Sequence, residues 1–284
     1  MPEKKMPDCL NSQEPHGPSD GKIKTLFLSD LHLGTRHCQA DLIIDFLEAH
    51  ESEVIYLIGD IIDGWRLKRS WYWPTAHDAV YRAILRKARR GVKVFYIPGN
   101  HDAFVRRFSG KRIRNVEILD HAIHETAAGR RYLVTHGDQY DLVVQNARWL
   151  ADLGDRFYEF ALTTNTLLNV VRARLGLDYW SLGAFAKRHV KSFVSIISQF
   201  ETVVAEEVRT RELDGVICGH IHHAVIRTMG DIHYVNTGDW VETCSAVAEH
   251  ADGRLEVIRW TDRAQSRRQP APFPLAPSVD DRVS

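Results

Sequence analysis

The stretch Ile23–Gly34 (IKTLFLSDLHLG) starts as a run of apolar residues and ends in a polar cluster that contains Asp30 and His32. Four further clusters follow it along the chain, each with a histidine or carboxylate beside a glycine or a small turn. They are Gly59–Gly64 (GDIIDG), Gly99–Asp102 (GNHD), Thr135–Asp138 (THGD) and Gly219–His222 (GHIH). One such cluster would be a weak signal, but five in this order indicate a shared site.

Each cluster directly follows a short apolar segment that has the composition of a buried strand. These segments are Ile23–Leu28, Val54–Ile58, Val92–Ile97, Tyr132–Val134 and Val216–Cys218. Helical patterns near Asp41–Ala49 and His77–Arg90 lie between the strands, and this alternation predicts an α/β fold. Because ligands bind at the carboxyl ends of strands in α/β sheets, we expect the five clusters to converge there.

A second set of strand patterns follows the fifth cluster, with tight turns at Gly230-Asp231 and Asp252-Gly253. These patterns predict antiparallel strands that finish a second sheet, at Val225–Met229, Asp231–Val235, Ser245–Glu249 and Leu255–Trp260. We therefore expect a β-sandwich flanked by helices, with four layers in the order helix, sheet, sheet, helix.

The strand rhythm is absent from residues 142–211, where apolar residues recur at helical spacing. We interpret this stretch as a helical cap inserted into a core formed by residues 22–141 and 212–261. An equally good alternative is that the stretch only packs on the sheet and completes the core. Residues 1–21 and 262–284 are rich in proline, serine and charge, and are predicted to be disordered tails.

The overall composition is balanced, since 37 Lys and Arg offset 37 Asp and Glu among 284 residues. Such a balance gives no reason to expect nucleic acid as the main partner. The stretch from Arg66 to Arg114 differs, with fourteen basic residues against two acidic ones. It predicts a positive face that attracts an anionic substrate or membrane surface, or else a solvated helix face.

The four cysteines are far apart and form no C-x-x-C pair, which fits a reducing cytosol. They are Cys9, Cys38, Cys218 and Cys244. The first residues lack the apolar core of a signal peptide, and no stretch reaches the roughly 18 apolar residues of a spanning helix. If a membrane is involved, we expect the protein to rest on its surface.

The residue types in the clusters suit a pair of divalent cations about 3.5–4 Å apart, which is the arrangement that promotes phosphoester cleavage. Asp30 and His32 have i, i+2 spacing, which places both side chains on one side of an extended segment. The same argument applies to His220 and His222. Asp60 follows a buried strand, where an unpaired carboxylate would be costly, so it is the natural bridge between two cations.

Asn100 and His136 offer an amide oxygen and an imidazole that, with His220, would complete the second cation site. His101 adjoins Asn100 and is a candidate catalytic group that contacts the phosphate or protonates the departing oxygen. Asp102 is a candidate to orient the His101 ring, or alternatively to cap the helix that starts at Ala103. Further carboxylates beside the clusters are expected to bond to the imidazoles or to make turns; they are Asp63, Asp138 and Asp141.

These clusters resemble the calcineurin-like metallophosphoesterase superfamily over about Lys24 to Trp260. The resemblance implies two cation sites, a metallophosphoesterase β-sandwich and hydrolysis of a phosphoester. By that resemblance the first cation is held by Asp30, His32, Asp60 and His222, and the second by Asp60, Asn100, His136 and His220.

Within the superfamily, the short spacing, the His136-Gly137-Asp138 form and the predicted helical insertion look most like the UDP-2,3-diacylglucosamine diphosphatases of lipid A synthesis. That similarity implies a usually manganese-dependent pyrophosphatase that cleaves a glycolipid to lipid X and UMP. It also implies a cytoplasmic protein that is peripheral on the inner membrane, with a cap that holds the acyl chains. The substrate contacts it implies are Asn100, Asp141, Lys187 and Lys191. A solvated basic helix face is the alternative explanation for the two lysines.

One position departs from this pattern, because the best-studied branch of these diphosphatases carries arginine where this chain has His101. A sister branch is therefore an alternative, acting on another phosphodiester, a nucleotide or a phosphoprotein. A non-catalytic scaffold is a third possibility, although such a protein would be expected to lack ligands, and all seven are present here. The sequence leaves the oligomeric state open.

Overall fold

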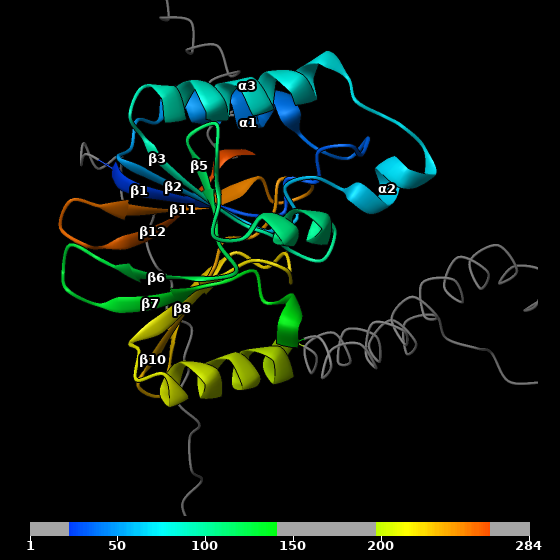
Figure 1. Ribbon diagram of the computed structural model, residues 1–284. Coiled ribbons are helices and arrows are strands. Elements are labelled where there is room, and N and C mark those ends of the chain that lie inside the picture. The colour runs from blue at the N-terminus through cyan, green and yellow to red at the C-terminus, as the bar shows by residue number, and fades with distance from the viewer. Residues whose placement is uncertain (1–22, 141–196, 262–284) are drawn as a thin grey trace, which may run out of the picture.

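The computed structural model describes residues 23–140 and 197–261 (Figure 1). Its strands are β1 (Ile23–Leu28), β2 (Val54–Ile58), β3 (Lys93–Ile97), β4 (Arg112–Ile113), β5 (Val116–Ile118), β6 (Ala122–Glu125), β7 (Arg131–Val134), β8 (Gly215–Cys218), β9 (Val225–Met229), β10 (Ile232–Asn236), β11 (Ser245–His250) and β12 (Leu255–Arg259). The helices include α1 (Ala40–Ala49), α2 (Gly64–Arg69) and α3 (Thr75–Arg89), with short 3-10 helices η1 (Ala103–Phe108) and η2 (Asp138–Tyr140).

Two sheets are formed, with strand orders β12-β11-β1-β2-β3-β5-β4 and β6-β7-β8-β10-β9. The strands β1, β2 and β3 run parallel to one another, and so do β7, β8 and β10. Since parallel strands need a crossover, α1 and α3 connect the first three strands over one face of their sheet. The predicted strand before each of the five clusters is confirmed. The strands β1, β2 and β9 also have the predicted bounds.

The sandwich has three layers of apolar side chains. Alternate residues of β1 point to opposite faces, so Leu26 and Leu28 pack under α1 and α3 while Phe27 faces the other sheet. The layer between the sheets also contains Tyr56, Ile58, Tyr132, Val134, Ile217 and Val235. A helix over residues 197–210 covers the outer face of the five-stranded sheet with buried residues that include Phe200 and Val204. The predicted order helix, sheet, sheet, helix is visible from top to bottom of Figure 1.

Our assignment of the last four strands to a second sheet is only half right. The pair β9 and β10 joins the five-stranded sheet, but β11 pairs antiparallel with β1 and so extends the seven-stranded sheet together with β12. The chain crosses between the sheets in the loop after Asn236, and Trp240 N donates to Asp30 O at 3.0 Å in this loop. Local periodicity carries no information on which sheet a strand joins. The short strands β4, β5 and β6 were not predicted.

Part of the predicted cap lies in the described chain. Residues 197–210 form the helix on the five-stranded sheet, so this portion packs on the core, as the alternative interpretation has it. The rest of residues 142–211, with Lys187 and Lys191, lies outside the described residues, and so do Asp141 and both predicted tails. Among the described helices, none combines the length and the apolar character needed to cross a bilayer.

Candidate metal centre

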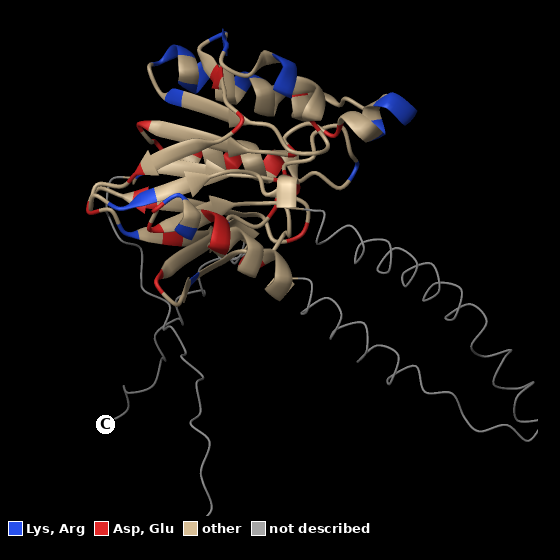
Figure 2. Cartoon of the chain, turned by 60° about the horizontal axis from the view of Figure 1, so that its bottom comes forward, with Lys and Arg blue, Asp and Glu red and all other residues tan. Residues whose placement is uncertain are grey.

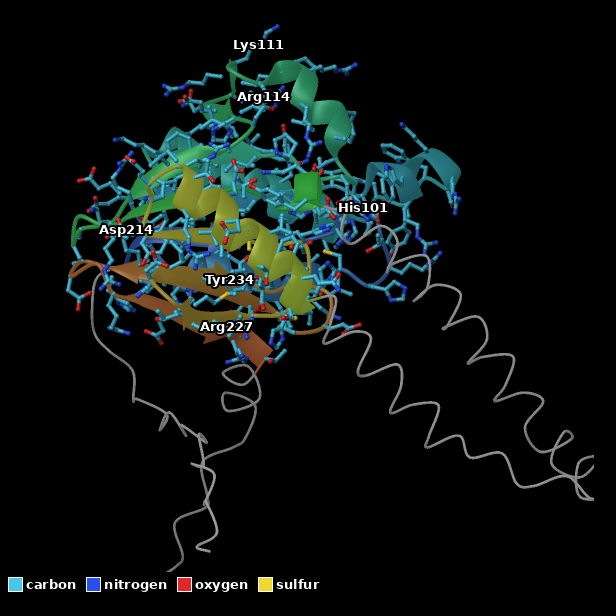
Figure 3. All side chains as sticks on the ribbon, turned by 90° about the horizontal axis from the view of Figure 1, so that it is seen from below. His101, Lys111, Arg114, Asp214, Arg227 and Tyr234 are labelled. Atoms are coloured by element: carbon cyan, nitrogen blue, oxygen red, sulfur yellow. The ribbon has the colours of Figure 1, made fainter. Side chains whose placement is uncertain are left out.

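The five clusters converge on one edge of the sandwich, as their positions at strand ends predict. Asp30, His32, Asp60 and Asn100 follow β1, β2 and β3 of the seven-stranded sheet, whereas His136, His220 and His222 follow β7 and β8 of the other sheet. Candidate ligands from both sheets therefore face each other across the sandwich edge. Figure 3 shows the site from below, with His101 labelled on the side where α2 projects.

Asp60 lies at the centre of this arrangement. Its Oδ1 atom is 3.5 Å from Nε2 of His136, and its Oδ2 atom is 4.0 Å from Nε2 of His32. Within the described ranges, three groups of carboxylates and imidazoles are compact enough to hold a metal ion, and two of them share Asp60. The groups are Asp30–His32–His222, His32–Asp60–His101 and Asp30–Asp60–His136.

The ring of His220 lies beside that of His136, with 5.0 Å between their centroids, and its backbone N donates to Asp30 Oδ2 at 3.0 Å. His220 is not a member of the three groups, so its position next to the second cation site rests on the contact with His136. His222 lies on the Asp30 side, with its Nε2 atom 3.0 Å from Asp30 Oδ1.

The backbone at the site is unusual. Nine residues other than glycine have a positive φ in the described chain, and five of them are predicted ligands: Asp30, His32, Asp60, His220 and His222, at 52–72°. This region is unfavourable for side chains with a Cβ and is concentrated at functional sites. The extended geometry that we predicted for Asp30-Leu31-His32 is therefore wrong. The two side chains still converge, to 3.9 Å between Asp30 Oδ1 and His32 Nε2, because both residues turn the chain.

Several buried nitrogen and oxygen atoms that could bind a metal ion have no hydrogen-bond partner among the described residues. They are Nε2 of His32, Nε2 of His136 and both amide atoms of the Asn100 side chain. The other ring nitrogen of His136, Nδ1, donates to Ile58 O at 3.0 Å, so Nε2 is the ring nitrogen that faces Asp60 and is available to a cation. A buried polar atom without a partner costs about 1–3 kcal/mol, and bound cations would remove this cost. The residues present thus fit a pair of divalent ions.

Charges within the site are strongly coupled. Burial opposes the ionisation of Asp60, yet His136 outweighs it and lowers the pKa of Asp60 to about 2. Burial likewise opposes the ionisation of Asp30, but His222 and the neighbouring imidazoles hold its pKa well below the usual range. Burial disfavours the charged form of His136, but Asp60 raises its pKa to about 10. The carboxylates are thus anionic at neutral pH, the state that binds a cation.

His101 is held from two sides at the rim of the site. Its Nδ1 atom is 3.1 Å from Asp63 Oδ2, and its Nε2 atom is 3.8 Å from Asp60 Oδ2. The ring of Trp65 lies over it, with a centroid distance of 4.2 Å and an interplanar angle of 33°. Asp63 also accepts from Arg66 N at 2.8 Å, so one carboxylate caps α2 and orients two imidazoles, those of His101 and His32.

Asp102 does not perform the role that we predicted for it. Its carboxylate is fully buried and accepts from Gly99 N at 2.6 Å, Ile61 N at 2.8 Å and Tyr96 Oη at 2.5 Å. It makes no side-chain capping bond to η1 either. Asp63 takes the position beside the His101 ring, because the chain turns after Asn100 and directs Asp102 inward. Asp102 instead ties two ligand loops together.

Replacing Asp102 with alanine should destabilise the fold, because four backbone N–H groups and the Tyr96 hydroxyl would lose their acceptor. We expect the free energy of unfolding to fall by about 3 kcal/mol or more, measured by urea denaturation. Tyr96→Phe removes one of these bonds and should cost about 1 kcal/mol. Unchanged stability with lost turnover in Asp102→Ala would restore the catalytic role.

Sequence reasoning missed residues that shape the fifth cluster. Asn236, at the end of β10, is fully buried and donates from Nδ2 to Gly219 O at 2.7 Å, while its Oδ1 accepts from Gly238 N at 3.0 Å. A polar residue inside an otherwise apolar strand was the available signal. Asp138, considered for a bond to an imidazole, instead pairs with Arg106 at 2.5 Å.

The comparison with protein families agrees with this geometry. A family model described as calcineurin-like phosphoesterase matches residues 23–224, well over half of the chain. The chain therefore belongs to the calcineurin-like phosphoesterase family, as the clusters predicted, and it is an enzyme of the metallophosphoesterase class. This class acts with divalent metal ions, for which the three groups above are candidates.

Comparison with individual proteins finds relatives whose names specify a substrate. The UDP-2,3-diacylglucosamine hydrolase of Xanthomonas campestris pv. campestris is 31% identical over 255 residues, covering 81% of this chain and 97% of that protein. The enzyme of the same name from Porphyromonas gingivalis is 24% identical over 252 residues, covering 78% and 91%. Among solved structures, the phosphoesterase Yfce from E. coli aligns with a TM-score of 0.46 and 14% identity, covering 84% of this chain and 94% of that one.

Proposed function

We propose that the chain is a two-metal hydrolase of a pyrophosphate or phosphodiester bond. The first cation would be held by Asp30, His32, Asp60 and His222, and the second by Asp60, Asn100, His136 and His220. The observation that carries this assignment is that the buried, unpartnered Nε2 atoms of His32 and His136 lie on either side of the Asp60 carboxylate. The amide atoms of Asn100 are likewise buried without a partner among the described residues, and the next residue, His101, donates its backbone N–H to Asp60 Oδ1 at 2.9 Å.

The bound cations would supply Lewis acidity and neutralise charge on the phosphoryl oxygens. The protein's own residues orient the His101 ring and supply a proton to the departing oxygen. The Nε2 atom of His101 faces the site, 3.8 Å from Asp60 Oδ2, while Asp63 Oδ2 lies 3.1 Å from Nδ1 on the other side of the ring. His101 is thereby suited to donate a proton or hydrogen bond to the departing oxygen, whereas Asp63 fixes the ring orientation.

The substrate that we propose is UDP-2,3-diacylglucosamine, cleaved to lipid X and UMP in lipid A synthesis. Support comes from the relatives that bear the name of this hydrolase, of which the Xanthomonas campestris enzyme aligns over 97% of its length at 31% identity. Manganese is the proposed metal, and the proposed location is the cytoplasmic face of the inner membrane. In this proposal Asn100, Asp141, Lys187 and Lys191 contact the substrate.

The test is to incubate the full-length protein with Mn²⁺ and the glycolipid, and to measure UMP by chromatography. We expect UMP release that stops on chelation and returns when Mn²⁺ is added. The variant His101→Asn should retain its metal content, measured by elemental analysis, but release UMP about 100-fold more slowly or worse. Absence of bound metal and of any turnover would contradict the two-metal assignment.

His101 supports one second candidate, a sister branch of these hydrolases with a different phosphodiester, nucleotide or phosphoprotein substrate. The observation in its favour is the imidazole at the position where the best-studied branch carries arginine. Turnover of a generic aryl phosphodiester by the Mn²⁺-loaded protein, without UMP release from the glycolipid, would select this candidate and leave the metal assignment intact.

A further inference from the structure

Residues 64–73, which we name the α2 arm, combine the most exposed aromatic side chains of the described chain with basic ones. Trp71 is 76% exposed and Trp65 is 51% exposed, the two highest values among the exposed large apolar residues. Phe104, 42% exposed, lies against Gly64 at the base of the arm. Two exposed tryptophans within one ten-residue segment indicate an interaction site.

The basic residues of the α2 arm differ from those on α3. Arg66, Lys68 and Arg69 are exposed and form no ion pair with the described residues, and the arm contains no acidic residue. On α3, Arg82 pairs with Asp78 at 2.7 Å and Arg86 with Glu48 at 3.5 Å, although Arg89 at its end is exposed and has no ion pair with the described residues. Figure 2 shows the blue residues of α2 at the edge of the molecule. The arm therefore offers uncompensated positive charge to a partner.

The α2 arm is attached directly to the candidate metal centre. Asp63 caps α2 and contacts His101, Trp65 lies on the His101 ring, and Gly64 N donates to His101 O at 3.0 Å. Leu67 packs against Gly34, which follows the first cluster. A surface that binds the α2 arm would therefore lie next to the candidate metal centre.

Tryptophan and arginine or lysine in one short segment match the interface of a bilayer. Indole rings prefer the headgroup layer, and basic side chains are attracted to anionic headgroups while their alkyl stems lie on apolar surface. A single-stranded nucleic acid would also match these charges and could stack its bases on an indole ring, but the chain as a whole carries no net positive charge, with 37 basic and 37 acidic residues. The combination favours a lipid surface.

We propose that the α2 arm docks the protein on a bilayer that contains anionic phospholipid, so that the metal centre opens at the lipid surface. This inference deepens the proposed function, because it names the surface that would make the peripheral membrane contact. A lipid substrate could then reach His101 and Asp60 without leaving the headgroup layer for water.

The test measures sedimentation of the full-length protein with vesicles of phosphatidylcholine mixed with phosphatidylglycerol. We expect wild type to sediment with them, and less with vesicles of phosphatidylcholine alone or at high salt. Trp71→Ala and the triple variant Arg66→Gln/Lys68→Gln/Arg69→Gln should each bind about tenfold more weakly. The matched controls are Arg89→Gln/Arg90→Gln/Arg114→Gln, which removes three exposed, unpaired cations elsewhere, and Tyr81→Ala. Both should bind like wild type. Equal losses in variants and controls, or no binding by wild type, would overturn the proposal.

A second measurement guards against misfolded variants. Trp71→Ala should turn over a soluble aryl phosphodiester at the wild-type rate when loaded with Mn²⁺, since the ring contact of Trp71 within the described residues is with Trp73 and not with the proposed ligands. Brominated phospholipid should quench the tryptophan fluorescence of wild type, and quench it less in Trp71→Phe, which should still bind. Quenching unaltered by Trp71→Phe would also overturn the proposal. Vesicle binding through the arm without UMP release would retain this inference and remove only the glycolipid assignment.

Discussion

Replacing Asp60 with asparagine should reduce kcat/KM about a thousandfold or more, which corresponds to about 4 kcal/mol of transition-state stabilisation. Asp60 is 2% exposed and faces His32 from one oxygen and His136 from the other. An amide preserves the shape but removes the negative charge that two cations would share. The measurements are turnover of an aryl phosphodiester and metal content by elemental analysis, where at least one ion should be lost.

The matched control for this variant is Asp120→Asn, which makes the same chemical change at an exposed carboxylate that bonds to Ser109. It should keep wild-type turnover and metal content. A protein with Asp60→Asn that still binds two ions and turns over at the wild-type rate would refute the proposal that Asp60 is the bridge.

Gly99→Ala should lower turnover about 100-fold, because the added methyl group would displace two proposed ligands. A Cβ atom at Gly99 would lie 2.4 Å from Asp60 Oδ1 and 2.6 Å from His136 Nε2, which is closer than van der Waals contact permits. Both side chains are buried and held by other bonds, so neither can withdraw freely. Turnover and metal affinity should fall together, whereas the circular dichroism spectrum should be retained.

Gly129→Ala serves as the control, since no atom lies within 4 Å of its added Cβ while its φ of +77° strains any other residue. It should lose about 1 kcal/mol of stability but no turnover. If Gly129→Ala lost as much activity as Gly99→Ala, general destabilisation rather than crowding at Asp60 would explain the effect.

Much of the fold was predictable because its signals are local. The apolar segments of β1 and β2 are bounded by turns and by polar clusters, so their limits could be read directly. The sheet joined by β11 depends on pairing with β1 more than 200 residues earlier, and no local pattern encodes such a partner. The helix over residues 197–210 was predicted as helical, but its contact with the five-stranded sheet is also long-range.

The sequence predicted that the five clusters meet at one site, but it did not predict the backbone conformation of the residues there. Ligand types at strand ends suffice to bring Asp30 and Asp60 together, since the parallel strands β1 and β2 share one carboxyl edge. His136 reaches them from β7 in the other sheet, so its position depends on how the two sheets pack. The left-handed backbone of Asp30 and His32 was not foreseen, because nothing in the residue types demands it. Asp102 and Asp63 were confused for a similar reason: both adjoin clusters, and only the direction of a turn decides which carboxylate reaches His101.

The division of the proposed ligands between the two sheets has a mechanical consequence. Four of the proposed ligands lie on one sheet and three on the other, so the spacing of two bound cations would depend on how the two sheets are positioned at the edge that they share. A small sliding motion of one sheet over the other would alter that spacing without breaking the hydrogen bonds between paired strands. Substitutions in the apolar layer between the sheets, at Phe27 or Val235 for example, are thus expected to change the turnover rate without touching the site.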